Sequence, residues 1–291
     1  MKAPPFDYVR ANTLAEVFQL WREAGPEARL LAGGQSLIAA LAFRLSEPSV
    51  LIDISRVADL TGITVKDGAL RVGALTTHAE LGANALVRQH APLLGEAVPL
   101  IAHPAIRNRG TLGGSLAYAD PAAELPACCV ALGATIIARS ATGERRIAAE
   151  AFFLSLYATA LAANELIAAV EFPLRKPGER STILELARRS GDYAMAGIVA
   201  RTAFEGSRLV DPRIVLFGVG EVPVMAIRAM AALAGRPAEP ASIAAAQAAL
   251  AQELDPPADL NGGADMKRHL AQVLLARAIG RLATGGEARA Q

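Results

Sequence analysis

The stretch Leu30-Leu31-Ala32-Gly33-Gly34-Gln35-Ser36-Leu37 decides the fold class of the first part of this chain. Residues 29–32 predict a short strand, Gly33-Gly34 predicts a turn, and a short helix is expected to begin at Ser36. Glycine allows positive φ and lets a ligand approach the backbone closely. The free N–H groups of such a turn and helix start favour phosphate oxygens. The same pattern is also typical of a simple tight connection, and a single occurrence does not separate the two interpretations.

A second glycine pair lies in Thr111-Leu112-Gly113-Gly114-Ser115, within a stretch from 103 to 126 that is rich in Gly, Pro and Asn. This stretch is expected to be irregular, and long irregular stretches inside a compact domain are usually functional. Two glycine segments in one domain could contact a diphosphate from both sides. Neither is a G-x-G-x-x-G motif, and Gly218-Val219-Gly220 is expected to be only a strand end.

The elements around these segments predict an α+β chain. A capping box formed by Thr13 and Glu16 opens a helix, and the unit that it begins extends to about residue 57. Residues 58–177 form a second α/β unit that includes a hairpin with Asp67-Gly68 at its turn. Residues 178–291 read as strands followed by helices, which predicts a separate domain of antiparallel strands and helices. The first two units together, residues 1–177, form one predicted domain.

The composition excludes several classes of protein. The chain has 291 residues, of which 53% are hydrophobic and 20% are charged, and its net charge is +1. These values are typical of a globular protein and not of a disordered one. The near-neutral charge argues against nucleic acid as a main partner. We see no apolar signal-peptide region and no apolar stretch that would span a membrane, so the expected location is cytoplasmic.

Cysteine and histidine do not suggest a metal site. The two cysteines, Cys128 and Cys129, are neighbours in an apolar run and are expected to be buried small hydrophobic residues. Two cysteines cannot hold an iron–sulfur cluster, which typically needs four ligands. His78, His90 and His269 are isolated and are expected at the surface. No metal site is expected in this chain, so any cluster needed for electron transfer must lie in another chain.

Several motifs together resemble one family. AGGQS at 32–36, TLGGS at 111–115, ADPAAELP at 119–126, RRSGDYAMAG at 188–197 and GVGEVPV at 218–224 occur at specific spacings. The combination closely resembles the FAD-binding (medium) subunit of the molybdenum hydroxylases, the xanthine dehydrogenase and aerobic carbon monoxide dehydrogenase family. The resemblance covers nearly the whole chain. It implies a vanillyl-alcohol-oxidase-type FAD-binding domain of two α/β subdomains, followed by the smaller C-terminal domain.

The resemblance also implies a set of FAD-binding positions. The two glycine segments would hold the diphosphate, Glu124 a ribose hydroxyl, and Tyr193 would lie beside the isoalloxazine ring. The full set is Leu30, Leu31, Ala32, Gly33, Gly34, Gln35, Ser36, Leu37, Ile101, Thr111, Gly113, Gly114, Ser115, Glu124, Leu166 and Tyr193. No catalytic acid or base is expected. Valine at Gly33 or Gly113 is expected to abolish FAD binding by blocking close approach of the backbone.

The chain departs from the family pattern at some positions. Relatives often have His where this chain has Tyr118, and many place a Lys near the flavin in the strand that here contains Glu185. The missing Lys leaves the redox tuning of the flavin open, and the effect of Tyr118 in place of His is a separate open question. Arg107, Asn108 and Arg109 precede the second glycine pair. They would either help with phosphate binding and loop order or form a solvated or partner-facing loop.

The function implied by the resemblance is electron relay. A large subunit with a molybdopterin-type molybdenum cofactor would oxidise the substrate, and a small subunit with [2Fe-2S] clusters would pass electrons to FAD in this chain. The complex would be a dimer of heterotrimers, and its substrate and final acceptor stay open. A self-sufficient flavin oxidoreductase of the same fold is the main alternative. A non-catalytic subunit that has lost its flavin is a third interpretation.

Overall fold

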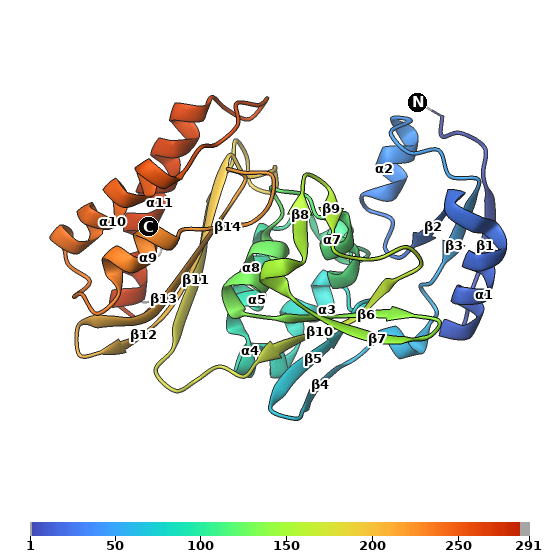
Figure 1. The fold of residues 1–291 in the computed structure, drawn as a ribbon, viewed down its shortest axis with the longest axis horizontal. Coiled ribbons are helices and arrows are strands. Elements are labelled where there is room, and N and C mark those ends of the chain that lie inside the picture. The colour runs from blue at the N-terminus through green and yellow to red at the C-terminus, as the bar shows by residue number, and fades with distance from the viewer. Residues whose placement is uncertain (1, 286–291) are drawn as a thin grey trace.

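The computed structural model describes residues 2–285, and the chain forms three units that follow one another along the long axis of the molecule (Figure 1). The N-terminal unit holds a three-stranded parallel sheet in the order β1-β3-β2. Its elements are β1 (Asp7–Arg10), α1 (Leu14–Ala24), β2 (Ala28–Leu31), α2 (Leu37–Ala42) and β3 (Val50–Asp53). The turn from β2 to α2 carries the first glycine pair, as predicted.

The central unit is built on a five-stranded antiparallel sheet in the order β4-β5-β10-β6-β7. Its strands are β4 (Ile63–Lys66), β5 (Ala69–Gly73), β6 (Thr135–Ser140), β7 (Gly143–Ala148) and β10 (Leu166–Pro173), with a small hairpin of β8 (Phe153–Ser155) and β9 (Ala158–Thr159). Its helices are α3 (His78–Ala83), α4 (Ala85–His90), α5 (Pro92–Ala97), α6 (Pro104–Arg107), α7 (Leu112–Tyr118) and α8 (Glu124–Leu132). Asp67 and Gly68 both have positive φ at the β4–β5 turn, which is the backbone that Asp-Gly favours.

The C-terminal unit is a four-stranded antiparallel sheet covered on one face by helices (Figure 1). Its elements are β11 (Arg180–Leu186), β12 (Ala196–Glu205), β13 (Arg208–Phe217), β14 (Val224–Met225), α9 (Ile227–Leu233), α10 (Pro240–Glu253) and α11 (Ala264–Ala283). Leu184 and Leu186 pack with the helices, whereas Ile183 belongs to the core of the central unit. The sheet therefore has two buried faces, because successive side chains of a strand point to opposite sides.

The predicted α+β fold class is confirmed, but three local predictions were wrong. The stretch 103–126 is not irregular, because it contains α6, α7 and the start of α8. The helix expected over 92–102 ends at Ala97 and continues as a 3-10 turn. The helix expected from Thr77 to Val87 is divided at Asn84, whose side chain accepts the N–H groups that open α4.

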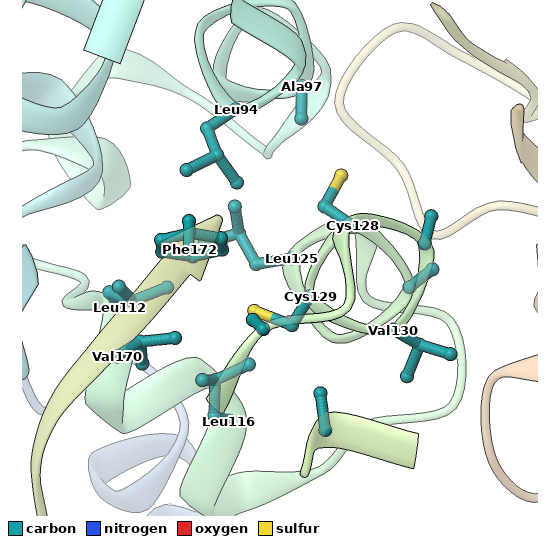
Figure 2. Packing of buried hydrophobic residues seen from close by; sticks show 14 of the residues in the cluster. Leu94, Ala97, Leu112, Leu116, Leu125, Cys128, Cys129, Val130, Val170 and Phe172 are labelled. Atoms are coloured by element: carbon teal, nitrogen blue, oxygen red, sulfur yellow. The ribbon is translucent and has the colours of Figure 1, made fainter. Parts of the chain in front are cut away.

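Helix α8 lies at the centre of the molecule and contacts both larger sheets. In Figure 2, the sulfur atoms of Cys128 and Cys129 point in different directions among apolar side chains such as Leu94 and Leu116. Both thiols are free and buried, and burial raises the pKa of each well above its usual value. The prediction that they are buried small hydrophobic residues is therefore confirmed.

Gly218, at the end of β13, joins the C-terminal unit to the central unit. Its N–H donates to the carbonyl oxygen of Pro121 at 2.8 Å. Its own carbonyl oxygen accepts a hydrogen bond of 2.9 Å from Nζ of Lys267, a residue of α11 that is only 1% exposed. The same ammonium pairs with Asp259 at 2.6 Å, so its charge is compensated. The hydrogen bond from Gly218 to Pro121 thus connects the segment at 120–121 of the central unit to the C-terminal unit.

Candidate functional site

One large cavity of about 960 Å³ is lined by the N-terminal and central units together. Residues of the β2–α2 turn line one wall, and residues of α7 and the start of α8 line another. The loop between β11 and β12 adds Gly191, Asp192 and Tyr193. The two glycine segments, far apart in sequence, therefore face one common space.

All the expected FAD-binding positions line this cavity except Leu31. They are Leu30, Ala32, Gly33, Gly34, Gln35, Ser36, Leu37, Ile101, Thr111, Gly113, Gly114, Ser115, Glu124, Leu166 and Tyr193. Leu31 does not line the cavity, because neighbouring side chains on a strand point to opposite faces and Leu30 occupies the cavity side. The Leu31 side chain instead lies against the backbone of Gly34.

The first glycine segment leaves its backbone donors free. Within residues 2–285, the N–H groups of Gly33, Gly34, Gln35 and Ser36 have no hydrogen-bond acceptor. Ser36 is the N-cap of α2, but its side chain makes no capping hydrogen bond. Gly34 has φ +74°, a conformation that glycine adopts without strain. This wall of the cavity is therefore rich in unpaired donors that suit an anion.

The second glycine segment uses its donors within the protein. It forms the first turn of α7, where Leu112 N–H donates to Thr76 O and Gly113 N–H donates to Ala74 O. Gly114 N–H donates at 3.1 Å to Oγ1 of Thr111, the N-cap residue. The cavity side of this segment therefore offers side chains such as the Ser115 hydroxyl rather than backbone N–H groups.

Two of these glycines are required by protein packing. A Cβ atom on Gly33 would overlap the carbonyl oxygen of Arg109, which lies on the segment before α7. A Cβ atom on Gly113 would lie 2.5 Å from Cβ of Ala74 and 2.9 Å from its carbonyl oxygen. The expected effect of valine at these positions therefore needs a different physical reason. The new side chain would first meet neighbouring protein atoms, and only then a ligand.

Three carboxyl groups lie at the start of α8. Burial, together with the neighbouring charges of Glu185 and Asp120, raises the pKa of Glu124 to about 8. Burial also raises the pKa of Glu185 to about 7, and one of its carboxylate oxygens is buried without a hydrogen-bond partner among residues 2–285. Asp120 accepts the Ala122 N–H at 2.9 Å, and burial raises its pKa as well. At neutral pH, Glu124 is therefore mostly protonated when nothing is bound beside it.

The cavity also includes side chains that sequence reasoning missed. His78 was expected at the surface but is 6% exposed, and burial lowers its pKa. Its Nε2 lies 3.2 Å from the carbonyl oxygen of Thr111, so this nitrogen carries the proton. Asp120 also lines the cavity. The capping box of Thr77 and Glu80 and the Asp-Pro step at 120 were the available signals in the sequence.

The rim around Ile101 and Ala102 is ordered by Arg107. Its guanidinium donates to the carbonyl oxygens of these residues at 2.7 and 2.8 Å, and Ala102 has φ +38°. The basic segment was expected either to help with phosphate binding and loop order or to form a solvated or partner-facing loop. The two hydrogen bonds of Arg107 show that this residue orders the loop. Asn108 and Arg109 are exposed.

Two other kinds of site are absent from residues 2–285. Over residues 2–285, no group of three or more His, Cys, Asp or Glu side chains is placed to hold a metal ion. In the same part of the chain, no helix combines the length and apolar character needed to cross a membrane.

The lining of the cavity fits FAD. A flavin dinucleotide needs N–H donors for its diphosphate, an acceptor for ribose hydroxyls, and apolar or aromatic surfaces for its rings. The Gly33–Ser36 wall, Glu124, and the side chains of Ile101, Leu166 and Tyr193 meet these needs. In comparisons with known proteins, the family profile "FAD binding domain in molybdopterin dehydrogenase" matches residues 4–175. This chain belongs to that family of molybdenum hydroxylase flavoproteins. The profile "CO dehydrogenase flavoprotein C-terminal domain" matches residues 181–282.

Relatives of this flavoprotein are subunits of dehydrogenase complexes. It is 39% identical over 280 residues to the alpha subunit of the 6-hydroxypseudooxynicotine dehydrogenase complex of Paenarthrobacter nicotinovorans, covering 96% of this chain and 95% of the relative. It is 33% identical over 279 residues to the carbon monoxide dehydrogenase medium chain of Hydrogenophaga pseudoflava, covering 96% and 97%.

Solved structures of related enzymes match nearly the whole chain. Carbon monoxide dehydrogenase from Hydrogenophaga pseudoflava matches with a TM-score of 0.95 and 34% identity, over 99% of this chain and 100% of that chain. Quinoline 2-oxidoreductase from Pseudomonas putida 86 matches with a TM-score of 0.94 and 39% identity, over the same shares. The flavoprotein is thus the medium, FAD-binding subunit of a molybdenum hydroxylase-type complex, which confirms the family, the cofactor and the oxidoreductase class that the sequence motifs indicated.

Proposed function

We propose that this flavoprotein relays electrons from iron–sulfur clusters of a small partner subunit to an external acceptor. A large partner subunit with a molybdopterin-type cofactor would oxidise the substrate, and the complex would be a cytoplasmic dimer of heterotrimers. When bound, FAD supplies the redox chemistry by accepting single electrons and releasing them in pairs. The observation that carries the proposal is the cavity, which unites the expected cofactor positions of two separate units.

The residues of this chain bind and orient the cofactor in this proposal. The free N–H groups of Gly33 to Ser36 would hold the diphosphate, and the Ser115 hydroxyl would approach it from the other wall. Glu124 would accept a ribose hydrogen bond, and Tyr193 would shield the isoalloxazine ring. We also propose that the FAD-binding domain ends near residue 177, between the two matched profiles.

The first experiment is purification of the chain from its native host with whatever binds to it. The visible spectrum is recorded, the released cofactor is identified by mass, and the co-purifying chains are counted. We expect flavin and iron–sulfur absorption, released FAD and two further subunits. An intact complex that lacks flavin, even after FAD is added, would contradict the proposal.

A second measurement separates the relay from a self-sufficient flavoenzyme. The complex and the isolated FAD-loaded chain are each mixed anaerobically with substrate of the complex, and flavin bleaching is followed at its absorption maximum. We expect reduction in the complex and none in the isolated chain. Reduction of the isolated chain at the same rate would favour the self-sufficient enzyme.

A further inference from the structure

Three of the four tyrosines of the chain lie close together beside the cavity. Tyr118 ends α7, Tyr157 lies in the turn between β8 and β9, and Tyr193 lies in the loop before β12. The β8–β9 hairpin and α7 are neighbours in Figure 1. The rings of Tyr118 and Tyr157 have centroids 5.2 Å apart and meet edge to face at 64°. Tyr118 and Tyr193 line the cavity itself.

Two of these tyrosines are exposed, and one of the two has a strained backbone. Tyr157 is 52% exposed and Tyr193 is 64% exposed. Ser155 pairs with Ala158, so Leu156 and Tyr157 form a two-residue hairpin turn, a place where Asn-Gly or Gly is normally found. Tyr157 has φ +56°, which is strained for a residue with a large side chain. Strain of this kind collects at functional sites.

The charged side chains that act on these tyrosine hydroxyls are acidic. Burial first, and then the negative charge of Asp120, raises the pKa of all three tyrosine hydroxyls, that of Tyr193 to about 12. Glu124, once ionised, acts on Tyr193 in the same direction. Asp192 and His103 also line this cavity. Arg188, on the neighbouring loop, donates to the carbonyl oxygen of Leu260.

We propose that Tyr118, Tyr157 and Tyr193, with Asp120 beside them, bind a planar aromatic molecule that is uncharged or cationic. Flat rings pack well against aromatic faces and edges, and cations are attracted to the faces of tyrosine rings. A carboxylate at the same place repels anions. The inference rests on the proposed function, because a molecule in this position would lie next to the ring system of the cofactor and be suited to act as the external electron acceptor.

The test uses the purified FAD-loaded complex and two planar tricyclic probes of opposite charge, methylene blue and anthraquinone-2-sulfonate. Their dissociation constants are measured by equilibrium dialysis, and FAD absorbance is recorded in every sample. We expect methylene blue to bind about tenfold more tightly than anthraquinone-2-sulfonate. Asp120→Asn should remove most of this preference. Equal affinities for the two probes in the unmodified complex would overturn the proposed charge selection.

Three variants test the aromatic part of the site. Tyr157→Ala should weaken methylene blue binding about tenfold, whereas Tyr157→Phe should keep it, because the ring and not the hydroxyl makes the contact. Phe43→Ala is the matched control, since Phe43 is 61% exposed but lies outside the cavity. Unchanged binding in Tyr157→Ala would refute the site.

The FAD measurement separates the two proposals. Normal FAD content without probe binding would overturn this inference alone. Probe binding that occurs only in FAD-free protein, and is displaced by FAD, would also overturn it, because the tyrosines would then line only the cofactor position. Absence of FAD would instead contradict the proposed function.

Discussion

The two glycine segments have similar sequences, yet they differ in how their backbone donors are used. At Gly33–Ser36, which line the cavity, four consecutive N–H groups have no acceptor among residues 2–285. At Leu112–Gly114, the N–H groups bond to Thr76, Ala74 and Thr111. Similar glycine pairs therefore differ in whether their backbone N–H groups are free or bonded within the protein. The first leaves its donors free for the anionic group that we propose, and the second fixes the helix that carries Ser115 to the segment after β5.

The largest effect is expected for Gly113→Val, which breaks the second segment. The new side chain would overlap Ala74 in a fully packed region, and overpacking of this kind should lower the free energy of unfolding by about 3 kcal/mol. Urea unfolding of the FAD-free chain, followed by circular dichroism, measures this. Gly95→Ala is the control, because a Cβ atom there meets nothing within 4 Å. An equal stability of the Gly113→Val and Gly95→Ala variants would show that the second segment is not structural.

Gly33→Ala is expected to lower both the stability of the chain and its affinity for FAD. The Cβ atom would push the donor segment away from the carbonyl oxygen of Arg109, so the four free N–H groups would move from their present positions. The dissociation constant of FAD should rise roughly a hundredfold, or about 2.7 kcal/mol. Fluorescence titration of the FAD-free chain measures it, with urea unfolding as a check on the fold. Unchanged affinity would remove the distinction between the two segments.

The pH dependence of stability tests whether the carboxyl group of Glu124, at the start of α8, is buried. Glu124 has a pKa of about 8 in the folded chain and 4.5 in the unfolded chain, so the unfolded state loses its proton first as pH rises. The FAD-free chain should therefore lose about 2 kcal/mol of stability between pH 6 and pH 7. In Glu124→Gln, the decrease of the free energy of unfolding over this pH range should be less than half as large. The remaining decrease is expected from Glu185, whose pKa is also raised. Rising stability over this range would show that Glu124 is not enclosed as described.

The smallest effect is expected for Arg109→Ala. This side chain is exposed, and the carbonyl oxygen, which is the atom near Gly33, stays in place. Stability should change by less than about 0.5 kcal/mol, and FAD affinity should hardly change. The same titration as for Gly33→Ala shows this. A large loss of affinity would mean that the guanidinium contacts the cofactor. It would then support the interpretation in which Arg109 helps to bind phosphate.

Local sequence signals were sufficient where short segments determine the structure. The strand, glycine turn and helix of residues 28–42 were predicted from a few letters, as was the hairpin with Asp67-Gly68 at its turn. The family resemblance supplied the cofactor positions, and the cavity contains all of them but Leu31. That exception follows from the alternation of a four-residue strand, which the motif alone does not reveal.

Long-range contacts account for what the sequence did not predict. Helix α7 begins with Leu-Gly-Gly, a poor helix-forming sequence, and it is stabilised by hydrogen bonds to Ala74 and Thr76 on a distant segment. The burial of His78 depends on the same contact, because its ring lies against Gly110 and Thr111. The different use of the two glycine pairs was likewise invisible, since it depends on which acceptors the fold brings near them.

The central position of α8 limits how this protein can be simplified. A fragment that ends near residue 177 would keep the cofactor positions except Tyr193, but it would uncover the flank of α8 that β12 and β13 shield. Cys128 and Cys129 lie on this helix, so the fragment would risk self-association and oxidation. The bond from Gly218 to Pro121 would also be lost. Engineering of a minimal flavin carrier from this scaffold should therefore retain β11–β13 and α11, or replace the apolar flank of α8 with polar side chains.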